Sequence, residues 1–403
     1  MAWLSLVGLS TSVGRTVLDI LSSIFFFDLG LSIYFFLFNL FLIGHGFTEK
    51  TLGFLTSAMA AGNIAGTIPA GKLARKLGLQ KALLVFFILA TVIFVMRSFT
   101  LSHTFQLVLA FLAGMTLSTW AVCLSPTVAQ LTNERTRPFA FSLVFSTGIV
   151  IPSLGGLAGG ILPGWLAQTA LPIHSLEPIQ VVILASCGIL GMGIWPVLKL
   201  QIGRAPILTK TRRTFNPFLL RFLPAIALWS MVDDSFSPFA NVYFARHLQM
   251  SLPRIGLTFS LAQLAQVLAV LAVPLAFRKF GLVAGITYMQ MATSLALASL
   301  GMAHRATTAA FIYVAYTAFQ CGEPGMYSLL MSRVPAEERS SASALNAFVM
   351  SCSQAIAAGL AGASIARFGY PPALWVTSAI SLAAACLFWR LPRSANPEHS
   401  LRG

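Results

Sequence analysis

Apolar residues along this chain gather into twelve long stretches, separated by short polar or basic connections. A bilayer core about 30 Å thick needs about 20 helical residues to cross it, and the stretches are near that length or longer. In lipid every backbone polar group must be satisfied internally, which favours helices. The predicted membrane-spanning helices cover residues 17–43, 51–71, 79–97, 104–129, 139–163, 178–198, 217–245, 255–277, 281–302, 306–332, 342–366 and 371–389. The pattern predicts an all-α polytopic membrane protein.

The second half of the chain repeats landmarks of the first half about 203 residues later. The basic turn at 75–78 returns at 278–281, and Gly53 and Gly256 each lie 25 residues before the glycine of their turn. Further pairs are Asn39 with Asn241 and the segment 133–135 with 337–339. Internal repeats of this kind are typical of transporters. We therefore predict two pseudo-symmetric six-helix bundles, 1–200 and 217–403, the second with a short tail, joined by a basic linker at 201–216.

Composition excludes a water-soluble globule, because only 9% of the residues are charged where a soluble domain carries roughly 25%. The net charge of +15 follows the loops. When the loops are assigned to alternating sides, twenty of the 26 Lys and Arg residues fall on one side. The positive-inside rule makes that side cytoplasmic. It predicts a protein of the cell membrane with both termini in the cytoplasm. The basic charge therefore indicates topology in a lipid bilayer and no nucleic-acid partner.

The loop between the second and third predicted helices resembles a motif of the major facilitator superfamily, G-x-L-A-D-R-x-G-R-R-K. Here residues 71–81 read GKLARKLGLQK, and a more degenerate copy stands at 274–281, as in the family. The Glu-Arg pairs after helices 4 and 10 are similar to the family pattern as well. The resemblance covers the whole chain. It implies a secondary transporter of a small molecule that works as a monomer, without a cofactor.

One position departs from the family motif, since Arg75 replaces its acidic residue. In the family that acid helps to hold one conformation, so the resemblance implies a different network here. Arg75 or Lys76 would pair with Glu134, and Arg278 or Lys279 with Glu337 or Glu338. The alternative is that these charges only set topology, and exposed pairs contribute only ~0–1 kcal/mol. The gating-loop candidates are Arg75, Lys76, Gly78, Glu134, Arg278, Lys279, Gly281 and Glu338.

Helix 5 carries a partial match to the family's antiporter motif, which ends in G-P-x-x-G-G. Residues 151–156 read IPSLGG and lack the glycine before Pro152. The match implies proton-driven export. Close packing of helices through small residues is the alternative explanation.

Acidic side chains within predicted spans need a reason, because burying a charge in the bilayer costs at least ~2.5–3.5 kcal/mol. Helical spacing places Asp28 on one face with Ser32, Phe35 and Asn39, and helix 7 repeats this stripe as Ser230, Asp234, Ser237 and Asn241. Helix 10 adds Tyr316, Gln320, Glu323 and Tyr327, with a helix break expected at Pro324-Gly325. In the family, helices 1, 4, 7 and 10 line the central cavity. The substrate or proton-coupling candidates are Asp28, Ser32, Asn39, Asp234, Ser237, Asn241, Tyr316, Gln320, Glu323 and Tyr327.

A carboxyl group in low dielectric favours its neutral form, and it can take up a proton on one side and release it on the other. Fixed, hydrogen-bonded structural acids are the alternative, and Asp233 is expected to face a neighbouring helix. No Lys or Arg is expected deep in a span, because Arg97 and Arg221 lie at helix ends. A cavity with acids and aromatics but no cation suits cationic, neutral or amphiphilic ligands. The histidines and cysteines show no metal-binding spacing.

The leading prediction is proton-coupled export of an amphiphilic or cationic compound by alternating access. Uptake of a neutral metabolite by the same fold is the next. From other classes, a membrane-embedded enzyme acting on lipid-linked substrates, with Asp233 and Asp234 holding a metal, and a non-transporting sensor remain alternatives.

Overall fold

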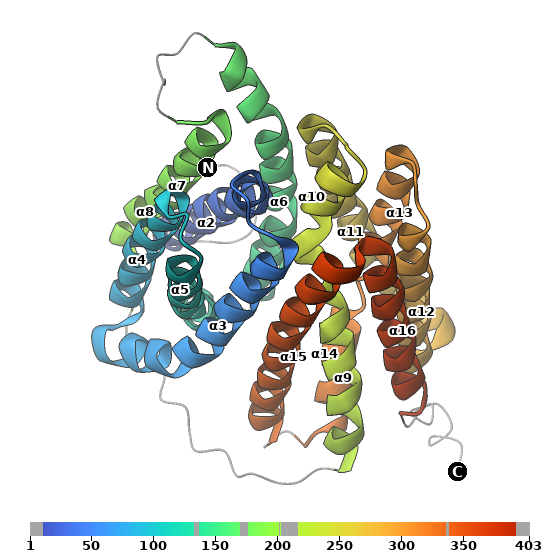
Figure 1. Ribbon diagram of the computed structural model, residues 1–403. Coiled ribbons are helices and arrows are strands. Elements are labelled where there is room, and N and C mark those ends of the chain that lie inside the picture. The colour runs from blue at the N-terminus through green and yellow to red at the C-terminus, as the bar shows by residue number, and fades with distance from the viewer. Residues whose placement is uncertain are drawn as a thin grey trace, which may run out of the picture.

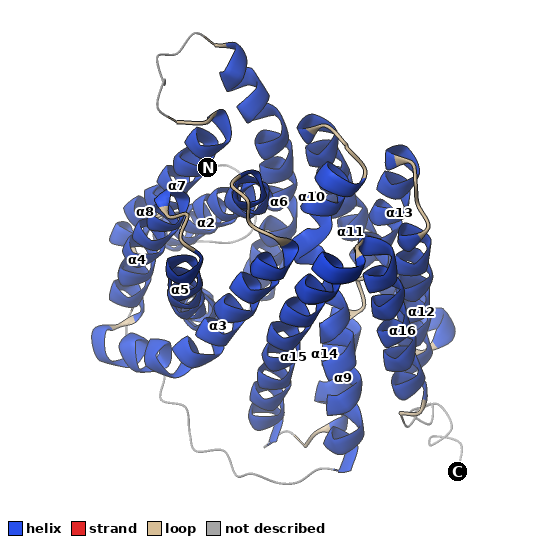
Figure 2. Ribbon diagram, in the orientation of Figure 1, coloured by secondary structure: helices blue, strands red, loops and turns tan. Residues whose placement is uncertain are grey.

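The computed structural model describes residues 11–132, 137–169, 176–200, 202, 217–335 and 338–391, which form helices joined by short loops (Figure 1, Figure 2). The helices of the first half are α2 (Thr11–Gly44), α3 (Glu49–Leu77), α4 (Leu79–Phe99), α5 (His103–Leu131), α6 (Arg137–Gln168), α7 (Pro178–Met192) and α8 (Ile194–Lys199). Those of the second half are α9 (Pro217–Phe236), η1 (Ser237–Phe239), α10 (Ala240–Val242), η2 (Tyr243–His247), α11 (Leu252–Phe280), α12 (Leu282–Gly301), α13 (Ala306–Phe319), α14 (Glu323–Arg333), α15 (Arg339–Phe368) and α16 (Tyr370–Trp389).

Each of the twelve predicted spans coincides with one helix or with a run of consecutive helices, which confirms the all-α prediction. Within the described ranges, nine helices are long and apolar enough to cross a membrane. The other three spans differ for local reasons. α9 carries Arg221 and two aspartates, α3 is rich in small and polar residues, and the span 306–332 is divided into α13 and α14. The break falls just before Glu323, and Pro324 then occupies the first turn of α14, where its missing N–H costs nothing.

The repeated basic turn has the same backbone geometry in both halves. Gly78 has φ 92° and its N–H donates to the carbonyl of Ala74, and Gly281 has φ 81° and donates to the carbonyl of Phe277. A positive φ favours glycine, because it has no Cβ. Gly78 and Gly281 are therefore required by the turn itself.

Two helix pairs make the most extensive contacts between the halves, α3 with α15 and α6 with α11. Gly53 of α3 lies against the backbone of Gly362, and Gly256 of α11 lies against the backbone of Gly160. A Cβ at either position would collide with the facing helix, so glycine permits the close crossing. Gly53 and Gly256 are equivalent in the sequence repeat, and the structure gives them equivalent contacts.

Serine side chains mark the same equivalence at these crossings. Ser57 of α3 donates a hydrogen bond to the carbonyl of Ala355, and Ser260 of α11 donates to the carbonyl of Ser153. Ser57 and Ser260 are 203 residues apart, the offset of the repeat. The pseudo-symmetry therefore extends to individual interhelical hydrogen bonds.

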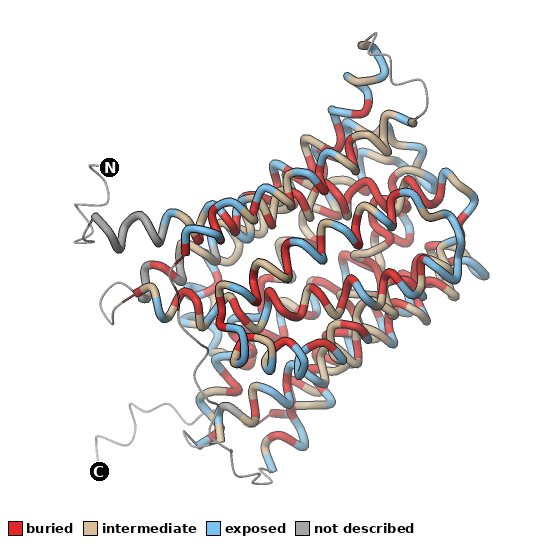
Figure 3. The backbone as a smooth tube through the Cα atoms, turned by 90° about the vertical axis from the view of Figure 1, so that its left-hand side faces the viewer, coloured by how far each residue is buried: buried red, intermediate tan, exposed pale blue. Residues whose placement is uncertain are grey.

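α3 and α15, one from each half, are closer at one end of the bundle than at the other (Figure 1). We name the end with Gly78, Gly281 and the start of α9 the basic end, and the end with the α2–α3 turn the opposite end. α3 and α15 are close near the opposite end and diverge toward the basic end (Figure 1). Buried and exposed positions alternate along the same helices (Figure 3), and large apolar side chains such as Leu271 and Phe311 are exposed, as lipid-facing positions require.

Candidate functional site

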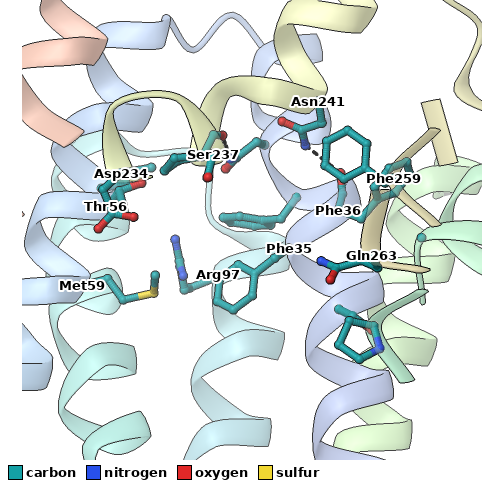
Figure 4. A pocket seen from close by; sticks show the side chains of 17 residues that line it. Phe35, Phe36, Thr56, Met59, Arg97, Asp234, Ser237, Asn241, Phe259 and Gln263 are labelled. Atoms are coloured by element: carbon teal, nitrogen blue, oxygen red, sulfur yellow. Dashed lines mark hydrogen bonds between the residues drawn. The ribbon is translucent and has the colours of Figure 1, made fainter. Parts of the chain in front are cut away.

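A cavity of about 450 Å³ lies between the two halves (Figure 4). Its wall comes from α2, α3, α4 and α6 of the first half and from α9, η1, α10 and α11 of the second. Five of the ten predicted substrate or coupling residues line it: Ser32, Asn39, Asp234, Ser237 and Asn241. Four phenylalanines complete much of the surface: Phe35, Phe36, Phe38 and Phe259. An apolar, aromatic wall with a few polar groups is typical of small-molecule sites.

The two repeated asparagines connect the halves across one side of the cavity. The side-chain amide of Asn39 donates to the carbonyl of Pro238, and that of Asn241 donates to the carbonyl of Phe36, both at 2.7 Å. Pro238 lies in η1, where the helix of the seventh span is interrupted. The two asparagines are therefore structural links between α2 and the seventh span as well as part of the cavity wall.

The two acids of the predicted stripes have different positions. Asp234 lines the cavity, and its carboxylate has no hydrogen-bond or ion-pair partner among the described residues. Asp28 is not part of the cavity wall. Its Oδ2 is buried without a hydrogen-bond partner and faces α6 near Gly148. The lower part of the helix 1 stripe therefore packs between α2 and α6.

Asp233 is the hydrogen-bonded member of the neighbouring pair of aspartates. Its Oδ1 accepts from Ser237 Oγ at 3.0 Å and from Gln320 Nε2 at 3.2 Å. Gln320 also donates to the hydroxyl of Tyr316 at 2.8 Å, and Tyr316 is buried. The candidates Tyr316 and Gln320 thus connect α13 to Asp233, which faces a neighbouring helix as expected.

The remaining candidates of helix 10 lie away from the cavity. Glu323 is exposed at the start of α14, and Tyr327 is exposed with its hydroxyl 2.8 Å from Ser343 Oγ of α15. Neither residue lines the cavity. Sequence spacing placed them on one face with Tyr316, but the break between α13 and α14 interrupts that face.

Arg97 is the main residue of the cavity that sequence reasoning missed. It lies in the last turn of α4, as expected, but its side chain is only 3% exposed and lines the cavity. The expectation of an interior without a cation is therefore wrong. The preference for cationic substrates was inferred from a cavity without a cation, so it loses its basis as well. The sequence showed only that Arg97 lies at the end of an apolar helix, and the structure extends that helix to Phe99.

The described residues include the basic members of the gating-loop pairs and Glu338. Glu134 and Glu337 lie outside the described residues. No ion pair joins Arg278 or Lys279 to Glu338 in the described part of the second half, and Lys279 Nζ instead lies 5.3 Å from the ring centroid of Phe280. Arg75 is half-buried and Lys76 is exposed.

An ion pair between the halves occurs instead at the opposite end. Arg246 Nη1 lies 3.7 Å from Glu49 Oε1, at the start of α3. Glu49 is largely covered, whereas the Arg246 side chain is half exposed. This pair, the two asparagine bonds and the glycine crossings all connect the halves toward one end of the bundle.

These features define a polytopic helical membrane transport protein, with a small-molecule cavity between two related halves. The sequence profile of the Major Facilitator Superfamily matches residues 20–332 and, in a second match, residues 222–403. The chain belongs to this superfamily. It is accordingly a transporter of small molecules and not an enzyme, which removes the alternative of a membrane-embedded enzyme acting on lipid-linked substrates.

Solved transporter structures share the fold. A bacterial homologue of the human lysosomal transporter Spinster, inward-facing and unoccupied, superposes with a TM-score of 0.74 at 11% identity over 96% of this chain and 100% of that chain. The nucleoside transporter NupG gives 0.73 at 12% identity, with coverages of 94% and 98%. The xylose transporter XylE from E. coli, inward open, gives 0.73 at 13% identity, with coverages of 96% and 97%. No curated protein matches the chain in sequence. These identities establish the fold alone.

Proposed function

We propose that this chain is a proton-coupled secondary transporter that exports a small organic molecule by alternating access. The observation that carries the proposal is the position of Asp234, a carboxylate on the cavity wall with no partner in the described residues. A charged carboxylate inside a membrane-spanning bundle has an unfavourable free energy. Binding or release of a proton by Asp234 would therefore change the free energy of the occupied cavity. Asp233, held by Ser237 and Gln320, is less suited to that exchange.

The proposed direction of transport rests on the charges of the loops and on the partial antiporter motif of helix 5. The basic end carries most of the Lys and Arg residues, so we assign it to the cytoplasm, together with both termini of the chain. α3 and α15, one from each half, diverge toward that end (Figure 1), which supports an inward-facing conformation for this structure. Pro152 and Gly156 of the partial antiporter motif line the cavity, which supports exchange of substrate against protons. The two halves, 1–200 and 217–403, would rock about the cavity within a single chain.

The size and lining of the cavity favour a small amphiphilic substrate. About 450 Å³ accommodates one aromatic ring with polar substituents, and the phenylalanines of α2 and α11 provide stacking surfaces. Because Arg97 lines the same cavity, a positive charge on the substrate is not required.

The proposal is tested in proteoliposomes that contain the full chain and carry an imposed pH gradient. Phenyltrimethylammonium, phenyl phosphate and phenyl glucoside serve as probes, and their accumulation is compared with that in protein-free liposomes. We expect at least one probe to accumulate only with the gradient, and Asp234→Asn to reduce this accumulation to the protein-free level. Ser230→Ala is the matched control, since Ser230 is buried outside the cavity wall. Accumulation independent of the gradient, or wild-type coupling in Asp234→Asn, contradicts the proposal.

A further inference from the structure

We propose that Arg97 binds an anionic group of the transported substrate, a carboxylate or a phosphate, at the wall of the central cavity. This inference names the substrate class of the function proposed above and rests on it. The juxtaposition that carries it is a buried guanidinium that lines the cavity without an acidic partner.

The burial of Arg97 leaves part of its charge without compensation. Arg97 is only 3% exposed, and its Nη1 has no hydrogen-bond partner. Neither of the two ion pairs found in the described ranges contains Arg97. A guanidinium remains charged in proteins, and a charge within a membrane protein normally finds a partner. The cavity is the place from which such a partner can come.

The surrounding residues hold the guanidinium in one orientation. Arg97 Nε donates to Gln106 Oε1 at 3.3 Å, and the amide of Gln106 donates to the carbonyls of Arg97 and Thr100 at 2.7 and 2.6 Å. The guanidinium carbon lies 4.6 Å from the ring centroid of Phe38. This cation–π contact compensates only part of the cost of burial. Because Nε is already bonded, the terminal nitrogens are the ones without a hydrogen-bond partner among the described residues, and Nη1 is itself buried. A planar guanidinium held in this way suits carboxylate or phosphate oxygens.

Asp234 belongs to the facing half of the same cavity, and no ion pair joins it to Arg97 among the described residues. Figure 4 shows the Arg97 side chain entering the space bounded by Asp234, Ser237 and Phe35. A positive or hydrogen-bond-donating group elsewhere on the substrate would compete with the proton on Asp234. Anion binding on Arg97 is therefore compatible with exchange against protons, and the substrate would contact both halves.

The test is a binding measurement without a gradient, on the full chain purified in detergent. Benzoate, phenyl phosphate, benzyl alcohol and phenyltrimethylammonium are matched aromatic probes, and thermal stabilisation reports binding. We expect benzoate or phenyl phosphate to stabilise the wild type more than the neutral and cationic probes. Whichever anion binds more tightly identifies the group that Arg97 recognises. Stabilisation by phenyltrimethylammonium alone, or none by either anion up to its solubility, overturns the inference.

Variants assign the effect to the side chain. Arg97→Gln should weaken anion binding about tenfold or more, since a charge-assisted hydrogen bond is lost, and leave benzyl alcohol unchanged. Arg97→Lys keeps the charge and should retain the preference for anions with weaker binding, which covers the case in which Arg97→Gln does not fold. Equal anion affinity in a folded Arg97→Gln protein, or loss of the anion preference in Arg97→Lys, overturns the inference. Transport without anion binding refutes only this inference, whereas anion binding without transport refutes only the proposed function.

Discussion

Asn39 and Asn241 make reciprocal hydrogen bonds across the interface between the two halves. Each side-chain amide donates at 2.7 Å to a backbone carbonyl of the other helix, Asn39 to Pro238 and Asn241 to Phe36. Figure 4 shows the second of these bonds. The two residues occupy equivalent positions in the sequence repeat. Separation of the halves at this side of the cavity requires both hydrogen bonds to break, so the pair stabilises the conformation described here.

Removal of either amide should therefore favour the other conformation. Asn39→Leu and Asn241→Leu each remove one interhelical hydrogen bond, worth about 0.5–1.5 kcal/mol. We expect a longer distance between spin labels placed at Ser102 and His304, two exposed residues at the opposite end, measured by double electron–electron resonance.

Asn63→Leu is the matched control, because Asn63 lies on α3 outside the cavity wall. An unchanged distance distribution in both cavity variants would show that the asparagines do not hold the halves together.

The glycine crossings predict effects of opposite sign for the same substitution. Gly53→Ala and Gly256→Ala place a Cβ against the backbone of a facing helix and should destabilise the protein by about 1–3 kcal/mol. Gly188→Ala meets no atom within 4 Å and should stabilise α7 by up to about 1 kcal/mol. Thermal unfolding in detergent measures all three. Equal stability of the three variants would mean that the crossings are looser than described.

The ion pair between Glu49 and Arg246 should contribute little to stability, because Arg246 is half exposed. We expect Glu49→Gln and Arg246→Gln to show a coupling of less than about 1 kcal/mol in a double-mutant cycle. The cycle is measured by thermal unfolding at low and high salt. A coupling that is larger, or that does not fall with salt, would indicate a buried latch rather than a surface pair.

Cysteines placed at two of the candidate residues should react with water-soluble thiol reagents. Ser32→Cys and Ser237→Cys lie on the cavity wall, whereas Ser230→Cys, buried outside it, should not react. The exposed native Cys386 is first replaced by alanine, and labelling is read from the mass of the modified peptide. A bound substrate should protect both cavity positions. If Ser32→Cys and Ser237→Cys remain unlabelled under every condition, the cavity is not open to water.

Much of the fold could be predicted from the sequence, because hydrophobic length and repeated local chemistry are properties of neighbouring residues. The twelve spans, the turn at Gly78 and Gly281 and the break beside Glu323 are of this kind. The sequence repeat also paired Gly53 with Gly256, although it did not show what either residue contacts.

Which side chains line the cavity could not be predicted from the sequence, because this depends on which helices cross and on how each helix is rotated about its own axis. Helical spacing grouped Asp28 with Ser32 and Asn39, but only packing against α6 separates Asp28 from the cavity. Adjacent aspartates have the same local sequence context, yet the contact with Gln320 of α13 engages Asp233 and leaves Asp234 on the wall.

By itself, the sequence determined the class of protein, the number of spans and the twofold repeat, since lipid imposes length and polarity on each segment separately. Only the tertiary structure decided that Arg97, at the end of an apolar helix, is buried on the wall of the central cavity. The physical reason is that the environment of a long side chain is set by the other helices packed around it, here α2 through Phe38 and α5 through Gln106.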